Sequence, residues 1–311
     1  MNPVHLETLL AIVDEGSFEV AAAVLGVSPS AVSQRIKSLE KATGRVLVRR
    51  SSPATATEAG EVLVQAARRM ALLQAETDSR LRGQLERVPL SVAVNADSLA
   101  TWFRPVLADV AAFRSATLRL RIEDEAHTLA LLRRGDVLGA ITREATPVSG
   151  CDSMPLGVMR YRAVATPRLR DAYTRGGEVD WANMPALRFG PNDALQDSDL
   201  DGRLDDAVRR HRAVSQIPSS EGFLEATRVG LGWSLVPELQ AGPLLASGEL
   251  VLLDATVIEV PLYWQRWRLE SDLLGRLTAS VAAAAIELPP EPWMIDSWGS
   301  GAGPSASAHR P

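Results

Sequence analysis

The first sixty residues divide into short apolar stripes separated by glycine and serine. Apolar side chains recur every three or four positions over residues 3–15, and Gly16 ends this first predicted helix. Ser17 is a good N-cap for a second helix over residues 18–25, because its hydroxyl accepts a hydrogen bond from the first turn. Gly26 then suits the position after the helix, where the left-handed conformation is common.

The next stretch, Ser28 to Glu40, has the clearest helical pattern of the chain. Ser28 is an N-cap, and Pro29 fills the first helical position, where a missing N–H costs nothing. One face is an apolar stripe of Val32, Ile36 and Leu39. The opposite face carries hydroxyl, amide and cationic side chains, at Ser30, Ser33, Gln34, Arg35, Lys37 and Ser38. Two helices joined by a tight turn with glycine predict a helix-turn-helix whose polar face enters a DNA groove.

The residue types on this face predict which part of DNA each side chain contacts. We expect Gln34 and Ser33 to contact base edges, because a side-chain amide can pair with adenine. Arg35 and Lys37 are predicted to contact phosphates. The complete set of predicted DNA-binding residues is Ser28, Pro29, Ser30, Ser33, Gln34, Arg35, Lys37, Arg49 and Arg50.

Residues 42–57 predict two short strands around a turn, the wing of a winged helix-turn-helix. Arg49 and Arg50 lie where such a wing meets the DNA backbone or the minor groove. Narrow minor grooves attract arginine because the negative potential is concentrated there. The alternative is that both are solvated surface arginines.

Residues 58–87 predict a long polar helix with a narrow apolar stripe of Val62, Ala66, Met70, Leu73 and Leu81. Packing within the chain does not account for so long a helix with so narrow a stripe, so we expect it to pair with a second copy. A dimer places two recognition helices about one DNA turn apart, which suits a two-fold symmetric operator. Gly83 and Pro89 are predicted to end the helix.

From residue 90 the pattern changes to alternating strands and helices. The elements predicted in this segment are strand 90–94, loop 95–98, helix 99–113, strand 118–122, helix 126–134 with Gly135 as its cap, and strand 137–142. This βαβαβ order predicts a parallel sheet.

A second α/β lobe is predicted beyond this sheet. Its elements are strand 159–166, which crosses from the first lobe, helices 199–211 and 221–229, and strand 232–236. Strand 261–267 then returns to the first lobe, and helix 270–286 closes that lobe. Two α/β lobes joined by two crossovers form the periplasmic-binding-protein arrangement. The predicted fold class is therefore α/β, with a mainly α winged helix-turn-helix domain at the amino terminus and a two-lobed, periplasmic-binding-protein-like effector domain.

These patterns divide the chain into four parts. The predicted parts are a DNA-binding domain at 1–58, a linker and dimerisation helix at 59–87, an effector domain at 88–295, and a disordered tail at 296–311. Within the effector domain, lobe I comprises about 88–162 and 265–295, and lobe II about 163–264.

The distribution of charge supports DNA binding although the net charge of the chain is −5. All six basic residues of the first 58 fall between residues 30 and 50, where Glu40 is the only acid. A basic stripe of this kind is the footprint of a nucleic-acid interface.

The bulk composition is that of a globular protein of two or three domains, with 311 residues and 46% hydrophobic side chains. No apolar run reaches the roughly 18 residues of a membrane span. The first ten residues lack the basic region of a signal peptide, and the single Cys151 suits a reducing compartment. We therefore expect a cytoplasmic protein without a membrane partner.

The order of residues over the first sixty positions resembles the amino-terminal signature of LysR-type transcriptional regulators. It is carried by Ser17-Phe18, Ala21-Ala22, Leu25, Val27-Ser28, Ser30-Ala31-Val32-Ser33, Ile36, Leu39-Glu40, Gly44, Leu47, Arg50, Thr57 and Ala59-Gly60. The family usually has Leu-Phe before the wing arginine, where this chain has Leu47-Val48. The string LYWQRWRLES at 262–271 resembles the ArgP/LysG branch, whose members sense basic amino acids.

Polar residues follow the ends of the predicted strands, where open parallel sheets bind ligands. The predicted effector-binding residues are Asn95, Asp97, Ser98, Thr101, Glu123, Asp124, Glu125, Thr142, Arg143, Asp193, Ser219 and Ser220, with Asn192 beside them. A zwitterion with an extra positive charge fits this set. We expect its carboxylate at Ser98 and a helix N-terminus or at Arg143, its amine at Asp97, and its cationic side chain at one of the three acids 123–125. The alternative is that Asp97 and Ser98 only cap a helix and that the acids form a solvated loop.

The resemblance, rather than the residue pattern, implies the ligand and the role. It implies L-lysine, arginine or histidine as effector, control of a basic-amino-acid exporter gene, a homodimer or homotetramer, and RNA polymerase as a partner. On this interpretation the ligand closes the two lobes and changes the spacing of the recognition helices.

Two other classes of function compete with this interpretation. An enzyme is disfavoured, because the four histidines are scattered and the sequence contains no GxxxxGK, GxGxxG or GxSxG motif. No metal or redox cofactor is indicated. An architectural DNA-binding protein, such as an inhibitor of replication initiation, differs from a specific regulator in losing little affinity when the operator is scrambled.

Overall fold

The structure is a computed structural model and describes residues 2–82, 88–113, 115–123, 125–190, 193, 195, 200, 203–205 and 212–290. The chain divides into two compact units, and each is described by itself. Unit 1 consists of Met1–Asn95, Pro105–Met154 and Trp264–Val281. Unit 2 consists of Ala96–Arg104, Pro155–Tyr263 and Ala282–Pro311.

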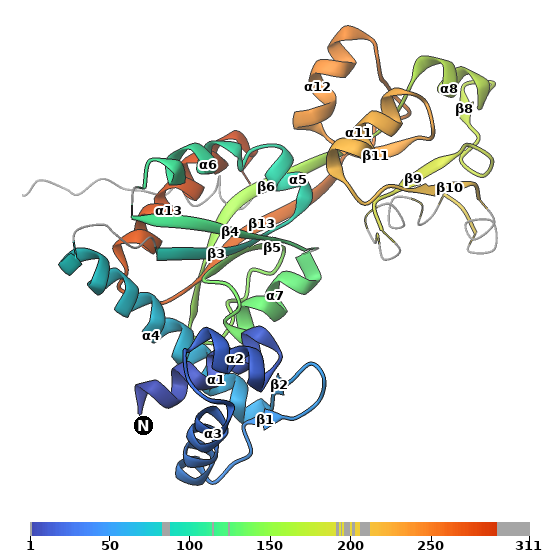
Figure 1. The fold of residues 1–311 in the computed structure, drawn as a ribbon. Coiled ribbons are helices and arrows are strands. Elements are labelled where there is room, and N and C mark those ends of the chain that lie inside the picture. The colour runs from blue at the N-terminus through green and yellow to red at the C-terminus, as the bar shows by residue number, and fades with distance from the viewer. Residues whose placement is uncertain are drawn as a thin grey trace, which may run out of the picture. The chain divides into compact units, whose positions relative to one another are not determined.

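Unit 1 begins with the predicted winged helix-turn-helix (Figure 1). Its elements are α1 (Pro3–Glu15), α2 (Phe18–Val24), α3 (Pro29–Thr43), β1 (Val48–Arg49) and β2 (Thr55–Ala56), with β1 and β2 antiparallel. Leu9, Ile12, Val32 and Ile36 are at most 1% exposed and form the centre of the core. The helices agree closely with the prediction, except that α3 continues to Thr43, so the wing begins after residue 42.

Helix α4 (Glu58–Arg82) follows the wing and is held close to it. Thr57 donates from its hydroxyl to the carbonyl of Val46 at 2.7 Å and accepts from the N–H of Gly60 at 3.1 Å. A Cβ on Gly60 would lie 2.0 Å from the carbonyl oxygen of Leu47, so only glycine permits this approach. The predicted stop at Gly83 lies outside the described residues.

The apolar residues of α4 occupy two faces, not the single stripe that the sequence analysis described. Val64, Ala67 and Leu72 are at most 5% exposed. Val64 and Ala67 pack in the core of the DNA-binding domain, so the prediction that packing within the chain does not account for this helix is wrong for that face. In the predicted stripe Ala66 is half-buried, and the exposed members are Val62, Met70, Leu73 and Leu81.

The prediction that Pro89 ends the linker helix is also wrong, because Pro89 lies within strand β3 (Val88–Val94). On one side Pro89 is opposite Thr117 of β4 (Ala116–Ile122). The other neighbour of β3, strand β5 (Gly139–Thr142), pairs only from Val92 onward. Strand β3 has only one neighbouring strand at residue 89, so the N–H that proline lacks is not needed for pairing and proline is tolerated there.

The rest of unit 1 is a sheet with helices on both faces. Strands β4 and β5 are both parallel to β3, which confirms the predicted βαβαβ unit, and the strand order continues from β5 to β13 (Ile258–Trp267). Helices α6 (Arg104–Ala111) and α13 (Asp272–Ala284) cover one face of the sheet, and α7 (Glu125–Arg134) covers the other (Figure 1).

The predicted helix 99–113 is interrupted. Helix α5 (Ala96–Ala100) ends before a turn that buries Trp102 and Phe103 completely, and α6 begins at Arg104. Pro105 explains the break, because in a continuous helix its ring would clash with the carbonyl four residues earlier. Since α5 begins at Ala96, Asp97 and Ser98 lie in its first turn and not in the predicted loop.

Unit 2 is the more irregular part, and many of its short elements were not predicted. Beyond α5, its elements are β6 (Cys151–Ala165, from Pro155 on), α8 (Pro167–Ala172), β7 (Thr174–Arg175), β8 (Glu178–Val179), β9 (Ala186–Arg188), β10 (Val214–Gln216), α11 (Ser220–Arg228), β11 (Ser234–Pro237), α12 (Glu238–Ser247), β12 (Val251–Leu252), the first residues of β13, and η1 (Ala285–Glu287). Strands β11 and β12 are antiparallel to β6, and β10 is parallel to β9.

Several predicted elements of this region are confirmed and one is not. Helix 221–229 and strands 159–166, 232–236 and 261–267 correspond to α11, β6, β11 and β13. Most of the predicted helix 199–211 lies outside the described residues, and Leu200 and 203–205, which are described, are not helical. The predicted tail also lies outside them.

Candidate DNA-binding surface and effector site

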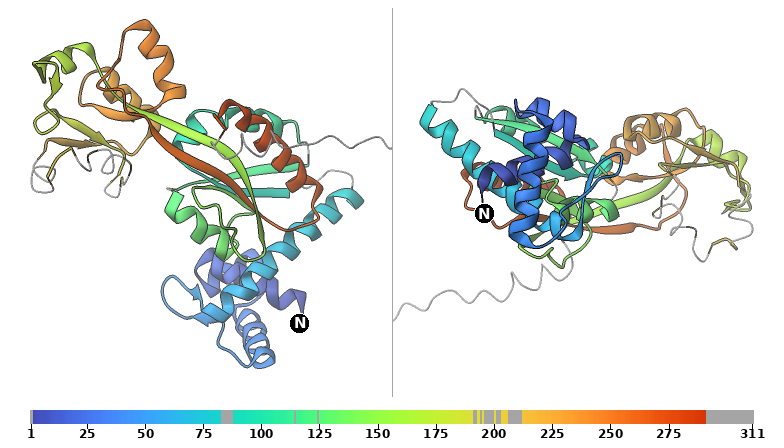
Figure 2. Two further views of the ribbon diagram at one scale, coloured as in Figure 1. Left: turned by 180° about the vertical axis from the view of Figure 1, so that it is seen from behind. Right: turned by 60° about the horizontal axis from the view of Figure 1, so that its bottom comes forward.

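Helix α3 presents the polar face that its sequence predicts. Gln34 and Lys37 are exposed and Ser33 is half-buried, while Val32, Ile36 and Leu39 are at most 1% exposed beneath them. The right view of Figure 2 brings the three helices of the DNA-binding domain forward.

The start of α3 is fixed by serine hydroxyl groups. The Ser28 hydroxyl accepts from the N–H of Ala31 at 3.2 Å and lies 2.9 Å from the hydroxyl of Ser30. This geometry confirms the predicted cap, and Pro29 occupies the first helical position. The first turn of α3 is therefore preorganised before any DNA is bound.

Arg35 differs from the other predicted contacts. Its guanidinium donates to the Thr8 hydroxyl of α1 at 3.3 Å, and its side chain is half-buried. Arg35 therefore ties α3 to α1 within the domain core. Lys37, which is exposed on the same helix, makes no such contact among the described residues.

The wing is fixed to α3 by the only acid of the basic window. The carboxylate of Glu40 accepts from the N–H of Leu47 at 2.9 Å, so this acid is committed to the wing backbone. Val48 is 4% exposed and fills the apolar position where the family usually has phenylalanine. Arg49 and Arg50 are both exposed, and the Arg50 guanidinium lies over the ring of Phe18, 4.9 Å from its centroid.

The predicted effector residues meet at Asp97, in unit 2. One carboxylate oxygen of Asp97 accepts from the hydroxyl of Tyr161 at 2.9 Å, and the other accepts from the hydroxyl of Ser220 at 3.3 Å. Both hydroxyl groups are neutral donors that orient the carboxylate. The structure thus brings together Asp97 and Ser220, which are 123 residues apart.

The residues around Asp97 support the backbone of α5. Thr101 donates from its hydroxyl to the carbonyl of Asp97 at 2.6 Å. Ser98 is fully buried, and its carbonyl accepts from the N–H of Phe103 at 3.0 Å. Asn95, in unit 1, is 5% exposed at the end of β3. The predicted role of Ser98 as a carboxylate ligand stays a prediction.

The other predicted effector residues lie in unit 1 or hold local structure. Glu123 and Arg143 are exposed, and the Thr142 hydroxyl is buried and accepts from the N–H of Glu144 at 3.2 Å. Asp124, Asn192 and the side chain of Glu125 lie outside the description.

Two predicted residues of unit 2 fulfil structural roles. Asp193 accepts from the N–H of Phe189 at 2.9 Å. Ser219 is the N-cap of α11 and accepts from the N–H of Gly222 at 3.3 Å. Ser220, the next residue, is the one that reaches Asp97.

Tyr161 was missed by the sequence analysis. It lies in β6, where it is only 2% exposed. The available signal was a tyrosine within a predicted apolar strand, because a buried phenol hydroxyl requires a hydrogen-bond partner. No local pattern indicated that this partner would be Asp97, 64 residues away.

The remaining chemistry is sparse. Burial is the main cause that raises the pKa of the Cys151 thiol to about 11, so this thiol is protonated and inert at neutral pH. Among the residues that the structure describes, no three histidine, cysteine or acidic side chains form a group that could hold a metal ion. Over the same residues, no helix is both long and apolar enough to cross a membrane.

A winged helix-turn-helix with an exposed polar recognition helix, followed by an α/β domain, defines a DNA-binding regulator. Residues 3–61 match the model of the bacterial regulatory helix-turn-helix protein, lysR family, and residues 45–284 match the LysR substrate binding domain. The chain therefore belongs to the LysR family of transcriptional regulators.

Three relatives cover almost the whole chain. The lysine export transcriptional regulatory protein LysG of Corynebacterium efficiens is 66% identical over 285 residues, which are 92% of this chain and 98% of that protein. Full-length LysG from Corynebacterium glutamicum with bound effector arginine has a TM-score of 0.81 and 63% identity, and the match covers 93% and 100%. ArgP from Mycobacterium tuberculosis has a TM-score of 0.81 and 42% identity, with 92% and 98% covered.

These relatives confirm the predicted ArgP/LysG branch. Their names are those of transcriptional regulators, not of enzymes, which confirms the expectation that the chain is not an enzyme.

Proposed function

We propose that this protein regulates transcription, in the cytoplasm, of a basic-amino-acid exporter gene in response to arginine, lysine or histidine. The protein binds its operator as a homodimer or homotetramer, pairs through the exposed stripe of α4, and acts on RNA polymerase. The observation that carries the effector assignment is the carboxylate of Asp97, oriented by Tyr161 and Ser220. The bound arginine of the related C. glutamicum LysG supports the ligand class.

The chemistry of Asp97 suits the α-amine of an amino acid. An ammonium group donates up to three hydrogen bonds, and each oxygen of a carboxylate can accept more than one. Bonds between ionised groups are shorter and stronger than neutral ones. Glu123, Asp124 and Glu125 are the proposed partners of the cationic side chain, and closure of the two predicted lobes is the proposed response.

The test of this assignment is calorimetric titration of the wild-type protein and the Asp97→Asn variant. Asparagine keeps the shape of the side chain and removes its charge. Arginine should bind the variant about tenfold to a hundredfold more weakly, since a hydrogen bond to a charged group contributes about 1.5–3 kcal/mol. Glu178→Gln is the matched control, because Glu178 is an exposed acid of unit 2 in β8.

Ligand analogues separate the roles of the charged groups. Nα-acetylarginine lacks the charged amine, so it should bind the wild type weakly and lose nothing further in Asp97→Asn. Citrulline, the neutral analogue of arginine, tests the cationic side chain instead. Equal arginine binding by wild type and Asp97→Asn would exclude Asp97 as the amine ligand.

The architectural alternative is tested with DNA. Fluorescence anisotropy at fixed salt compares the DNA upstream of the gene of this protein with a scrambled duplex. A regulator should bind the first at least a hundredfold more tightly. Equal binding to both duplexes would favour the architectural protein.

A further inference from the structure

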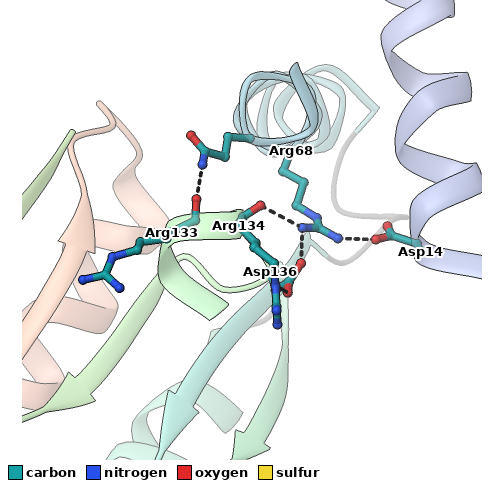
Figure 3. Close-up of polar contacts among 6 residues, drawn as sticks. Asp14, Arg68, Arg133, Arg134 and Asp136 are labelled. Carbon is teal, nitrogen blue, oxygen red and sulfur yellow. Dashed lines mark hydrogen bonds and ion pairs between the residues drawn. The ribbon is translucent and has the colours of Figure 1, made fainter. Parts of the chain in front are cut away.

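The carboxyl-terminal end of α7 is capped by side chains of α4. The side-chain amide of Gln65 donates to the carbonyl of Arg133, and the guanidinium of Arg68 donates to the carbonyl of Arg134 at 3.2 Å (Figure 3). The last carbonyls of a helix have no partner within it, so these two bonds satisfy groups that would otherwise need water. Gly135, with φ +74°, ends α7 so close to α4 that an added Cβ would lie 3.2 Å from the Cα of Gln65.

Arg68 also binds the DNA-binding domain. Its guanidinium forms ion pairs with Asp14 of α1 and with Asp136, the residue after the cap of α7 (Figure 3). Asp14 lies in the last turn of α1, where the helix dipole disfavours an acid and a nearby cation offsets that cost. The Arg68 side chain is only 17% exposed, so these interactions are less screened than those of a surface pair.

Arginine is the residue that suits this position. A guanidinium presents five donors in a rigid plane, so one side chain binds two carboxylates and a carbonyl at once. Arg134 donates to the second oxygen of Asp136 at 2.9 Å, which balances two acids with two arginines. We call the contacts of Arg68 with Asp14, Asp136 and the carbonyl of Arg134 the Arg68 clamp.

Two further contacts hold α4 on the same part of the effector domain. The Arg69 guanidinium lies over the ring of Trp267, 4.5 Å from its centroid, and the buried carboxylate of Glu76 accepts from the hydroxyl of Ser271. On its other face, α4 packs Val64 and Ala67 into the DNA-binding core. Helix α4 is therefore fixed to both domains, and Arg68 is the side chain at which the two attachments meet.

The opposite end of α7 adjoins the acids that we propose as effector ligands. Helix α7 begins at Glu125, directly after Glu123 and Asp124. Its ten residues span about 15 Å. Helix α7 is thus the element that joins these acids to the Arg68 clamp.

We propose that Arg68 is the positioning residue through which the effector domain sets the placement of the helix-turn-helix on DNA. The clamp fixes α1 to the end of α7, so the spacing and orientation of the recognition helices follow the effector domain. The part of this inference that concerns effector control rests on the proposed function, because it requires ligand at the acids before α7.

The first experiment tests positioning without any ligand. Footprinting on the upstream DNA defines the two half-sites, and anisotropy then compares the natural operator, the same operator with five base pairs inserted between half-sites, and a single half-site. The variants are Arg68→Ala, Arg68→Lys and Asp14→Asn. The Asp14 side chain is 44% exposed, so Asp14→Asn opens the clamp with little risk to folding.

Arg133→Ala is the matched control. It removes an arginine from the same helix end, but the exposed Arg133 side chain makes no contact with the clamp and points away from it in Figure 3. Only the backbone carbonyl of Arg133 is used, and alanine keeps it.

The wild type and Arg133→Ala should prefer the natural spacing at least tenfold. Arg68→Ala and Asp14→Asn should prefer it less than threefold, while binding the single half-site within twofold of the wild type. Arg68→Lys should fall between, because lysine keeps the positive charge but replaces the planar set of guanidinium donors by a single nitrogen. Unchanged spacing preference in Arg68→Ala and Asp14→Asn, or an equal loss on the half-site, would overturn the proposal.

The second experiment adds arginine. Calorimetry should give all variants the arginine affinity of the wild type within twofold, whereas the effect of arginine on operator affinity should disappear in Arg68→Ala and Asp14→Asn. Retention of the full arginine effect in both variants would contradict effector control through the clamp. Absence of arginine binding by the wild type would refute the proposed effector, and the spacing measurement would then decide the positioning role by itself.

Discussion

The DNA-binding surface and the effector site of this protein are assembled in different ways. Most of the predicted DNA-binding residues come from one stretch, Ser28 to Lys37, which forms a single helix with its N-cap. The Asp97 cluster instead combines residues of α5, β6 and α11 that lie 64 and 123 positions apart. The first site depends on local helix geometry, whereas the second depends on three separate elements packing in one arrangement.

The largest expected effect comes from removing the support of the recognition helix. Ile36→Ala deletes most of a side chain that is 1% exposed in the DNA-binding core, and such deletions cost about 2–5 kcal/mol of stability. Operator binding should fall more than tenfold in anisotropy titrations, and chemical unfolding should begin at lower denaturant. Calorimetric arginine affinity should stay within twofold, because Asp97 lies in unit 2. If Ile36→Ala lost operator binding and arginine binding together, the two sites would not depend on separate parts of the structure.

The next prediction distinguishes base recognition from phosphate contact by comparing two variants of the same helix, α3. Gln34→Ala should cost about 1–3 kcal/mol on the operator but little on scrambled DNA, because it removes a predicted base contact. Lys37→Ala should weaken both duplexes alike and reduce the slope of log affinity against log salt by about one. Anisotropy over a range of salt concentrations measures both quantities. A Gln34→Ala profile identical to that of Lys37→Ala would contradict the assignment.

A pH measurement tests the environment of Cys151. Like the Asp97 cluster, this environment depends on packing between elements that are far apart in the sequence. The folded-state pKa of Cys151 is raised from 9.0 to about 11, so its contribution to stability is complete below pH 9 and is lost as the pH rises towards 11. Between pH 8 and 10 the free energy of unfolding of the wild type should fall by about 1 kcal/mol more than that of Cys151→Ala. Chemical unfolding at both pH values measures this difference. Parallel pH profiles for the two proteins would show that the thiol is not shielded.

The smallest expected effect concerns the orientation of Asp97. Tyr161→Phe removes one hydroxyl and keeps the ring, so the carboxylate loses one of its two hydroxyl partners. Arginine affinity should fall about threefold to tenfold, since one hydrogen bond contributes about 0.5–1.5 kcal/mol. Thr227→Val, which removes a buried hydroxyl bonded to Ser234 in the same unit, controls for the loss of any buried hydroxyl. If calorimetry gave equal losses of arginine affinity for Tyr161→Phe and Thr227→Val, Tyr161 would have no specific role in binding.

The sequence by itself determined the winged helix-turn-helix, the parallel βαβ unit and the polar face of α3. These follow from residues that are close in the chain: a cap at Ser28, a proline at Pro29 and an apolar stripe at helical spacing specify one helix with one outward face. The family resemblance rested on the same local order, and the comparisons with known regulators confirmed it.

Only the tertiary structure decided which polar residues meet. It joined Asp97 to Tyr161 and Ser220, committed Glu40 to the wing, and placed Arg68 between Asp14 and Asp136. It also revealed the second apolar face of α4, which packs against the DNA-binding core. Periodicity reports which side of an element is buried, but not which element buries it. Contacts between distant residues depend on how whole elements pack, and no short stretch of sequence contains that information.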